Sequence, residues 1–341
     1  MKKKLGTIFQ FIFFIGLGIF LVWWSIKDLN TEDKSHIKTA LQNARVVLII
    51  PVFCILLLSH FVRAMRWKLL IEPLGYHPAK ANTFFAVAIG YLANQAVPRL
   101  GEVVKCTVLA KYEKIPADKL IGTIILERLI DAITLLVIFA ITLVIQPTIY
   151  QDLIDTFFNP AEASANEEIP MYIVILIALG ILMLAVAIWM FIKKKNLKDL
   201  IALCKRIWKS VWQGVGSIRH LRSRWQFLFY TISLWSLYFA GGYIGFFALR
   251  ETEMYGIREA FAILSAGSVG MIATPGGIGA YALLVEKTMQ IYGLQKGVAL
   301  AFGWLLWLAQ TSVILVGGLI SFGLLPWYNR KNKKDAADVG I

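Results

Sequence analysis

The sequence contains several apolar runs of about twenty residues, and these runs constrain the fold more than any other feature. A helix of this length rises far enough to cross the roughly 30 Å hydrocarbon core of a bilayer. Of the 341 residues, 58% are hydrophobic and only 16% are charged. In a soluble protein about a quarter of all residues are charged, and these residues cover the surface. The composition therefore predicts an all-α integral membrane protein rather than a water-soluble domain.

Six of these runs are long enough to cross the membrane as complete helices. The first follows Met1-Lys-Lys-Lys4, but it is too long for the apolar region of a signal peptide and lacks a small-residue cleavage site. We therefore expect it to remain attached as a transmembrane helix. The six expected spans cover about 6–26, 46–63, 121–146, 170–192, 226–249 and 297–325.

Two further apolar stretches, 83–97 and 260–274, are short for a complete span. Each runs into a proline followed by glycine residues, at Pro98 and at Pro275. Proline removes a backbone hydrogen-bond donor, and glycine permits a sharp turn. We therefore interpret both stretches as broken or re-entrant helices.

The two broken stretches occupy equivalent positions in the chain. Pro98 and Pro275 are 177 residues apart, and Gly90 and Gly267 have the same offset. With both termini on the cytoplasmic side, as the positions of the basic residues indicate, the first stretch enters from the cytoplasm and the second from outside. The sequence therefore predicts an inverted repeat, a recurring design of membrane transport proteins. The single polytopic membrane domain covers 1–341, and its repeat halves cover about 46–146 and 226–325.

Basic residues are distributed unevenly among the segments that connect the spans. The net charge is +14, and its positions predict that both termini lie on the cytoplasmic side, where positive residues concentrate. The segment 193–225 combines many Lys and Arg residues with Trp208 and Trp212. We interpret it either as an interfacial helix on the anionic inner leaflet or as a topology anchor only. The tail at 326–341 is a further basic segment. The net positive charge thus reflects the orientation of the protein in the membrane and not a nucleic-acid partner.

Three charged residues interrupt the expected span 121–146. Glu127, Arg128 and Asp131 lie inside it, with Asp131 about 15 Å from the start of the helix, near the bilayer midplane. Each ionisable group at this depth costs roughly 2.5–3.5 kcal/mol. We therefore expect the three side chains to pair through their i,i+3 and i,i+4 spacing. Such a cluster is either part of a transport path or a structural network that holds helices together.

The first helix break carries polar and charged residues. Arg99, Glu102 and Lys105 share one helical stripe, and Asn94 lies in the apolar half-helix before it. A guanidinium group suits a phosphate or a carboxylate, and the ends of broken helices offer backbone donors. This combination predicts a site for an anionic headgroup; the alternative is surface charge that caps a short helix. The expected path residues at this break are Asn94, Pro98, Arg99, Gly101 and Glu102.

The second break is rich in glycine and carries no charge before Glu286. It lacks the Lys-Ser/Thr pair of a P-loop, which argues against a nucleotide site. We therefore expect it to contribute backbone shape to the path. The residues concerned are Pro275, Gly276, Gly277 and Gly279.

The sequence carries no cofactor or metal motif. The three cysteines, Cys54, Cys106 and Cys204, are dispersed along the chain, and the four histidines lack the spacing of metal ligands. We therefore expect no cofactor, no metal and no catalytic residue.

These motifs, in this order, resemble the family named after the transmembrane region of lysylphosphatidylglycerol synthase. The resemblance covers about 60–325 and implies a polytopic bundle that moves an amphipathic lipid between leaflets. The fifteen residues after Pro326 are too few for the aminoacyl-transferring domain of the full-length synthases, so we expect a protein that is not an enzyme. The second break departs from the family pattern at Ala273 and at 280–282, where a proline and an acid are usual. The motifs are Arg63-x-x-Arg66-Trp67, Asn94-x-x-x-Pro98-Arg99-x-Gly101-Glu102, Glu127-Arg128-x-x-Asp131 and Pro275-Gly276-Gly277-x-Gly279. The residues that the resemblance implies as a polar path are Arg99, Glu102, Glu127, Arg128 and Asp131.

The leading hypothesis is a flippase-like transporter that moves an anionic or aminoacylated phospholipid, or a polyprenyl-linked lipid, across a bacterial-type cytoplasmic membrane. One alternative is a secondary transporter of a small soluble anion, with Glu127 or Asp131 carrying a proton. Another is an assembly subunit of a membrane enzyme. Lipid transport predicts a groove open to the bilayer, a soluble substrate predicts a sealed aqueous cavity, and fully paired, dry charges favour the assembly role. Because the sequence has no ATP-binding motif, a gradient or a partner would supply any driving force.

Overall fold

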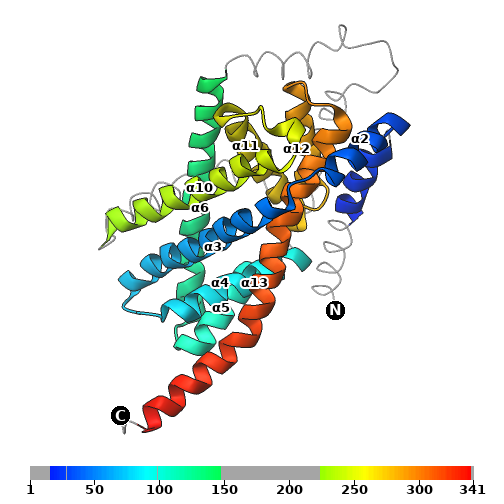
Figure 1. Ribbon diagram of the computed structural model, residues 1–341. Coiled ribbons are helices and arrows are strands. Elements are labelled where there is room, and N and C mark those ends of the chain that lie inside the picture. The colour runs from blue at the N-terminus through cyan, green and yellow to red at the C-terminus, as the bar shows by residue number, and fades with distance from the viewer. Residues whose placement is uncertain (1–15, 28, 98, 147–222, 339–341) are drawn as a thin grey trace, which may run out of the picture. The chain divides into compact units, whose positions relative to one another are not determined.

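The computed structural model describes residues 16–27, 29–97, 99–146 and 223–338, and this part of the chain is built of helices with short connections (Figure 1). An N-terminal helix covers Gly16–Lys27. Short 3-10 turns join some of the longer helices, and the turn at the second break is η7, Pro275–Gly277. The longer helices are α2 (Thr31–Gln42), α3 (Ile49–Ile71), α4 (Lys80–Ala96), α5 (Leu100–Glu113), α6 (Ala117–Ile145), α10 (Arg224–Gly245), α11 (Ile257–Ala273), α12 (Ala280–Ile291) and α13 (Lys296–Asp338).

Four described helices are long and apolar enough to cross a membrane, at four of the six places predicted from the sequence. Large apolar side chains such as Leu136 and Val137 on α6 are more than half exposed, as expected of helices in contact with lipid. The protein is therefore an integral membrane protein. The expected span 170–192 lies outside the described residues, as does nearly all of the basic segment 193–225. The four spans are Val46–Leu74, Ala117–Ile145, Arg224–Ala248 and Lys296–Arg330.

Two helices extend beyond their expected ends. The span expected from the sequence ends at residue 63, but α3 continues to Ile71, because Arg63 and Arg66 are buried against acidic partners instead of reaching water. The last helix passes through Pro326 and continues to Asp338. A proline removes one intrahelical hydrogen bond, and the residues on either side of Pro326 remain helical.

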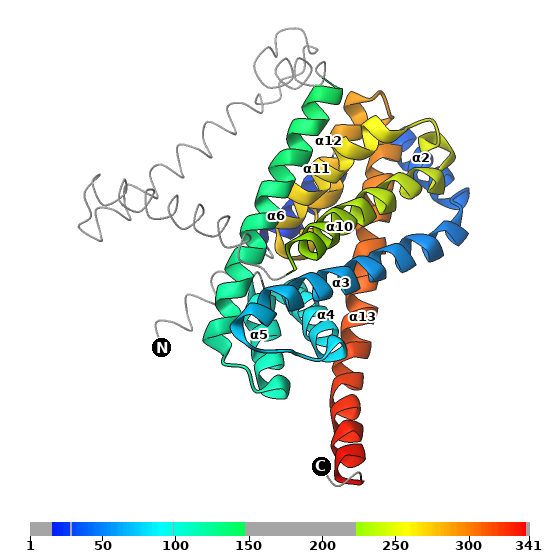
Figure 2. The same ribbon diagram turned by 90° about the vertical axis from the view of Figure 1, so that its left-hand side faces the viewer.

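The described helices form two series with the same order. A long helix is followed by a 17-residue helix, a break, a shorter helix and a second long helix, first in α3 to α6 and then in α10 to α13. Helices α4 and α11 start 177 residues apart, at Lys80 and Ile257. Figures 1 and 2 show α6 rising from its teal end to its green end, whereas α13 descends from orange to red. The corresponding last helices of the two series therefore run in opposite directions.

Both breaks lie where the sequence predicts them, and both use left-handed backbone. Arg99, at the start of α5, has a φ of 64°, which is uncommon for a residue with a side chain. At the second break, Gly276, Gly277 and Gly279 have φ values of 59°, 71° and 73°. Only glycine adopts this conformation without steric cost, so these three glycines permit the chain to turn between α11 and α12. Pro98 itself lies outside the described residues.

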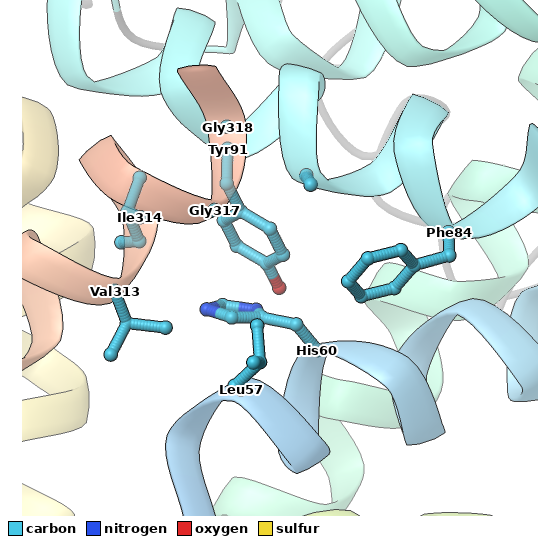
Figure 3. Close-up of a pocket in the computed structure, with 9 residues that line it drawn as sticks. Leu57, His60, Phe84, Tyr91, Val313, Ile314, Gly317 and Gly318 are labelled. Atoms are coloured by element: carbon cyan, nitrogen blue, oxygen red, sulfur yellow. The ribbon is translucent and has the colours of Figure 1, made fainter. Parts of the chain in front are cut away.

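Glycine residues also set how closely the helices pack. In α13, a Cβ atom on Gly318 would lie 2.7 Å from Leu92 Cβ and 3.2 Å from Ala88 O, both on α4. A Cβ on the neighbouring Gly317 would lie 3.8 Å from Leu57 Cδ1, an ordinary van der Waals distance. Figure 3 shows both glycines beside a small apolar cavity. The contact between α4 and α13 therefore depends on Gly318 and not on Gly317.

This difference predicts opposite effects of two adjacent substitutions. Gly318→Ala should destabilise the protein by about 1–3 kcal/mol because α13 must move away from α4. Gly317→Ala should be neutral or slightly stabilising, since alanine is the better helix former by about 1 kcal/mol. Thermal unfolding in detergent, followed by tryptophan fluorescence, measures both. Equal unfolding temperatures for the two variants would contradict the packing described here.

A buried ion-pair cluster as the candidate functional site

Helix α6 supplies the two acids at the centre of the site. Glu127 has no exposed surface, and the side chain of Asp131, one turn further on, is 13% exposed. The arginines that face them come from α3. Arg63 Nη1 lies 3.3 Å from Glu127 Oε1 and 2.8 Å from Asp131 Oδ2. Arg66 Nη2 lies 2.5 Å from Asp131 Oδ1. The main partners of both acids are therefore on another helix, not on α6 itself.

A buried lysine from α5 completes the inner part of the site. Lys105 Nζ donates to Glu127 Oε2 over 2.7 Å and lies 4.5 Å from the centre of the Trp67 ring. Trp67 in turn donates its indole N–H to Thr123 Oγ1 on α6, over 2.9 Å. Because these side chains are almost completely buried, the contacts join α3, α5 and α6 through one set of polar interactions.

A second, more exposed pair lies at the edge of the site. Arg128 Nε is 3.1 Å from Glu102 Oε1, and the two side chains are 41% and 31% exposed. The Arg128–Asp131 pair expected from i,i+3 spacing is present but longer, at 3.8 Å. We call the whole set the ion-pair cluster; its members are Arg63, Arg66, Lys105, Arg128, Glu102, Glu127 and Asp131.

The ion-pair cluster contains more positive than negative charge. Its four basic and three acidic side chains leave an excess of one positive charge when all are ionised. Among the described residues, Arg66 Nε and Nη1 and Arg63 Nε have no hydrogen-bond partner, although they are shielded from solvent. Buried guanidinium groups with unused donors favour an anion such as a phosphate or a carboxylate. The site is therefore suited to bind a negatively charged group.

Aromatic side chains border the cluster on the side of α4 and α10. Arg63 Nη2 donates to Tyr238 Oη over 3.1 Å, and its Cζ lies 5.6 Å from the centre of the Tyr91 ring. Tyr91 also packs against His60, with 4.6 Å between ring centres (Figure 3). It therefore separates the polar side of the site from the apolar cavity between α3, α4 and α13.

A small cavity lies beside the ion-pair cluster. Its volume of about 10 Å³ is enough for roughly one water molecule. It reaches the first break, and its volume leaves room for little more than this water molecule. The polar side chains that line it are Arg63, Tyr91, Asn94, Glu102, Lys105 and Arg128.

The residues expected to line a path at the first break have different roles in the structure. Asn94 Oδ1 accepts a hydrogen bond from the Gly101 backbone N–H over 2.7 Å and so caps α5. A Cβ on Gly101 would overlap the carbonyl oxygen of Gly90 and lie 2.6 Å from Asn94 Cγ. Arg99 is exposed and, within the described part of the chain, forms no ion pair with the cluster. Asn94 and Gly101 therefore position α5, whereas Arg99 lies apart from the buried acids.

The second break lies against the first. A Cβ on Gly276 would overlap the Gln95 carboxamide at the end of α4, and the Gly276 carbonyl accepts a hydrogen bond from Trp307 Nε1 over 2.8 Å. Gly279 packs against Gly18 O in the N-terminal helix. Pro275 is buried. None of these side chains adds charge to the site, so the second break shapes it through backbone packing.

The path residues expected from the sequence do not include Arg63, Arg66 or Lys105. The two arginines stand three residues apart at the end of an apolar run, which a helix ending at residue 63 would place in a loop. In a helix that continues past residue 63, i,i+3 spacing places both guanidinium groups on one face. This spacing is the signal that could have identified the two arginines as site residues. Among the described residues, no group of three or more His, Cys, Asp or Glu side chains is placed to hold a metal ion.

The burial of the ion-pair cluster predicts how the protein responds when it is broken. Glu127→Gln should destabilise the protein by about 3–5 kcal/mol because it leaves Lys105 without its buried anion and removes one of the two carboxylates that contact Arg63. Adding Lys105→Met should recover part of this loss, since the second substitution removes one of the unbalanced cations. Thermal unfolding of the two single variants and the double variant in detergent measures the coupling.

The half-exposed pair provides a matched control for that experiment. Glu102→Gln also removes one carboxylate, but solvent screens its pair with Arg128, so the expected cost is about 1 kcal/mol or less. A Glu127→Gln variant no less stable than Glu102→Gln would show that the buried contacts do not hold the helices together.

Comparison with known proteins agrees with the motif pattern. The model of the family "Lysylphosphatidylglycerol synthase TM region" matches residues 10–318. UPF0104 membrane protein MJ1595 from Methanocaldococcus jannaschii is 31% identical over 86 residues, which cover 24% of this chain and 26% of the relative. The chain thus matches about a quarter of the length of that relative. No solved structure matches the chain. Because the family model matches most of its length, the chain belongs to the family of the lysylphosphatidylglycerol synthase transmembrane region.

Proposed function

We propose that this membrane protein is a flippase-like transporter of lipids with an anionic or phosphate-containing headgroup. Its substrate would be an anionic or aminoacylated phospholipid, or a polyprenyl-linked lipid, in a bacterial-type cytoplasmic membrane. The observation that carries the proposal is the excess positive charge of the ion-pair cluster, which is buried among membrane helices beside a helix break.

Membrane energetics supports this function. Ionisable groups inside a bilayer are costly, and those that are retained commonly mark a path for a polar substrate. A headgroup phosphate would balance the excess charge and use the free donors of Arg66 and Arg63. The partially exposed pair of Glu102 and Arg128 lies at the edge, where an entering phosphate would first exchange partners.

The arrangement of the helices also fits transport. We propose that the two helix series form an inverted repeat, with both termini cytoplasmic and substrate bound where the two breaks meet. The opposite directions of α6 and α13, and the contact of Gln95 with Gly276, support this arrangement. The interfacial role of segment 193–225 on the anionic inner leaflet belongs to the same proposal.

The structure corresponds to a closed state in this proposal. A cavity for about one water molecule cannot hold a headgroup, so α4 and α5 must move away from α6 during transport. The glycine contacts between α4 and α5 and the left-handed backbone at each break provide points at which the chain can bend.

A second candidate function is a non-enzymatic assembly subunit of a membrane enzyme. It is favoured by the pairing of the deep acids, since Glu127 and Asp131 each contact at least two cations and the cavity beside them is small. A network of this kind can join helices without moving a substrate. Lipid transport activity separates the two functions.

Transport is tested with the purified protein in liposomes that contain fluorescent anionic, aminoacylated and polyprenyl-linked lipids. We expect faster exchange between leaflets than in empty liposomes for at least one of these lipids. Arg66→Gln should slow it by on the order of 10-fold to 100-fold, because it removes the excess charge and a charge-assisted hydrogen bond. Arg99→Ala should have little effect, since Arg99 lies outside the cluster.

Folding of each variant is checked by gel filtration and thermal unfolding before rates are compared. Exchange no faster than in empty liposomes across the whole lipid panel would contradict lipid transport and favour the assembly role. A slower rate for Arg99→Ala than for Arg66→Gln would place the headgroup path at the exposed break instead of the ion-pair cluster.

A further inference from the structure

A second buried acid, Glu286 on α12, lies outside the ion-pair cluster. Glu286 is 1% exposed, and two nearby residues of α12, Val285 and Met289, are fully buried. Its Oε1 atom lies 3.8 Å from Lys287 Nζ, and its Oε2 atom has no hydrogen-bond partner among the described residues. Neither the transport path nor the packing of α12 explains a carboxyl group at this position.

Comparison with Glu127 shows how differently the two glutamates are surrounded. Glu127 lies within 4 Å of three cations, all of them buried, at 2.7 Å from Lys105, 3.3 Å from Arg63 and 3.7 Å from Arg66. The only ion pair of Glu286 in the described residues is long and involves a lysine side chain that is 52% exposed. Burial disfavours a carboxylate whose negative charge is balanced by only one long ion pair, whereas a neutral carboxylic acid is tolerated.

Three charged groups act on Glu286 from the surrounding elements. Lys287 belongs to the same helix, Lys296 begins α13, and Asp33 lies in the first turn of α2. The two lysines favour a charged carboxylate and Asp33 opposes it. Lys287 is 52% exposed and its Nζ lies 3.8 Å from Glu286 Oε1, so a group in contact with solvent lies within 4 Å of the buried carboxyl group. A proton can therefore reach Glu286 from one side of the protein.

The geometry points to Glu286 as a proton-binding site that couples a proton gradient to movement of the second helix series. This inference rests on the proposed transport function and supplies its energy source. In the proposed topology, the end of α12 that carries Glu286 faces the outside. The carboxylate takes a proton from water on the outer side and becomes a neutral carboxylic acid, and after α12 moves it releases the same proton to water on the cytoplasmic side, so that one proton crosses the membrane in each cycle. The sequence contains no ATP-binding motif that would supply the energy in its place.

The position of Glu286 on α12 links its charge to the second break. The neutral acid is stable against the buried side chains of α12 and α13, whereas the charged form favours contact with water and lysine. Helix α12 begins directly after Gly276, Gly277 and Gly279, whose left-handed backbone allows the helix to change direction. Gain or loss of the proton would therefore bias the angle of α12 at this break.

Proton binding is tested without any lipid substrate by difference infrared spectroscopy between a mildly acidic buffer, at about pH 6, and an alkaline buffer; exposed carboxyl groups, with an ordinary pKa of about 4, are ionised in both. The wild-type protein should show the C=O band of a protonated carboxylic acid in acid and lose it in alkali. Glu286→Gln should lack this change, whereas Glu32→Gln, which removes an exposed carboxyl group on α2, should retain it. Glu286→Met replaces Glu286→Gln if the latter does not fold. A difference band of wild-type size in either Glu286 variant would overturn the inference.

Coupling is tested in liposomes with an imposed pH gradient, acidic outside. Lipid exchange by the wild-type protein should respond to the gradient, and Glu286→Gln should keep the rate seen without a gradient but lose the response. A wild-type rate that ignores the gradient, or a Glu286→Gln variant that still responds, would refute coupling and leave lipid transport intact. Absence of lipid exchange by the wild-type protein would refute the proposed function instead, and the infrared result would still decide whether Glu286 binds a proton.

Discussion

The contacts of Glu127 with Lys105 and the arginines of α3 are the interaction on which the described structure most depends. An unpaired carboxylate at this depth would be driven out of the membrane interior, so α3 and α5 must both lie beside α6. The close approach of Gly90 and Gly101 brings α5 near enough for Lys105 to reach the acid. The first helix break thus lets α5 lie against α4, which places the buried Lys105 beside Glu127.

The two helix series share an order of elements but use different chemistry. The first series buries the charges of Lys105 and Glu127 near its break, whereas the second has glycine and aromatic groups there. A second set of buried charges would add to the cost of burial. The glycine-rich break then supplies a surface that fits closely against the charged half.

Hydropathy and proline–glycine signals were sufficient to predict the helical class, four spans and both breaks. They were not sufficient for the site, because the acids of α6 were expected to pair along their own helix. Sequence spacing reports neighbours within one helix, whereas Arg63 and Arg66 reach Asp131 from another helix. The end of α3 was also not predicted correctly. A rule that places arginine in loops fails where a buried acidic partner compensates the charge of the arginine.

The contact between Gln95 and Gly276 has a consequence for how the two halves can act. The space of the missing Cβ atom at Gly276 is occupied by the Gln95 carboxamide, so neither segment can bend far without displacing the other. When the position of one segment restricts the position of the other, the conformational equilibria of the two segments are linked, and each affects the other equally. Ligand binding in the charged half and rearrangement of the glycine-rich half would then be cooperative, with one amide group as the mechanical connection between them.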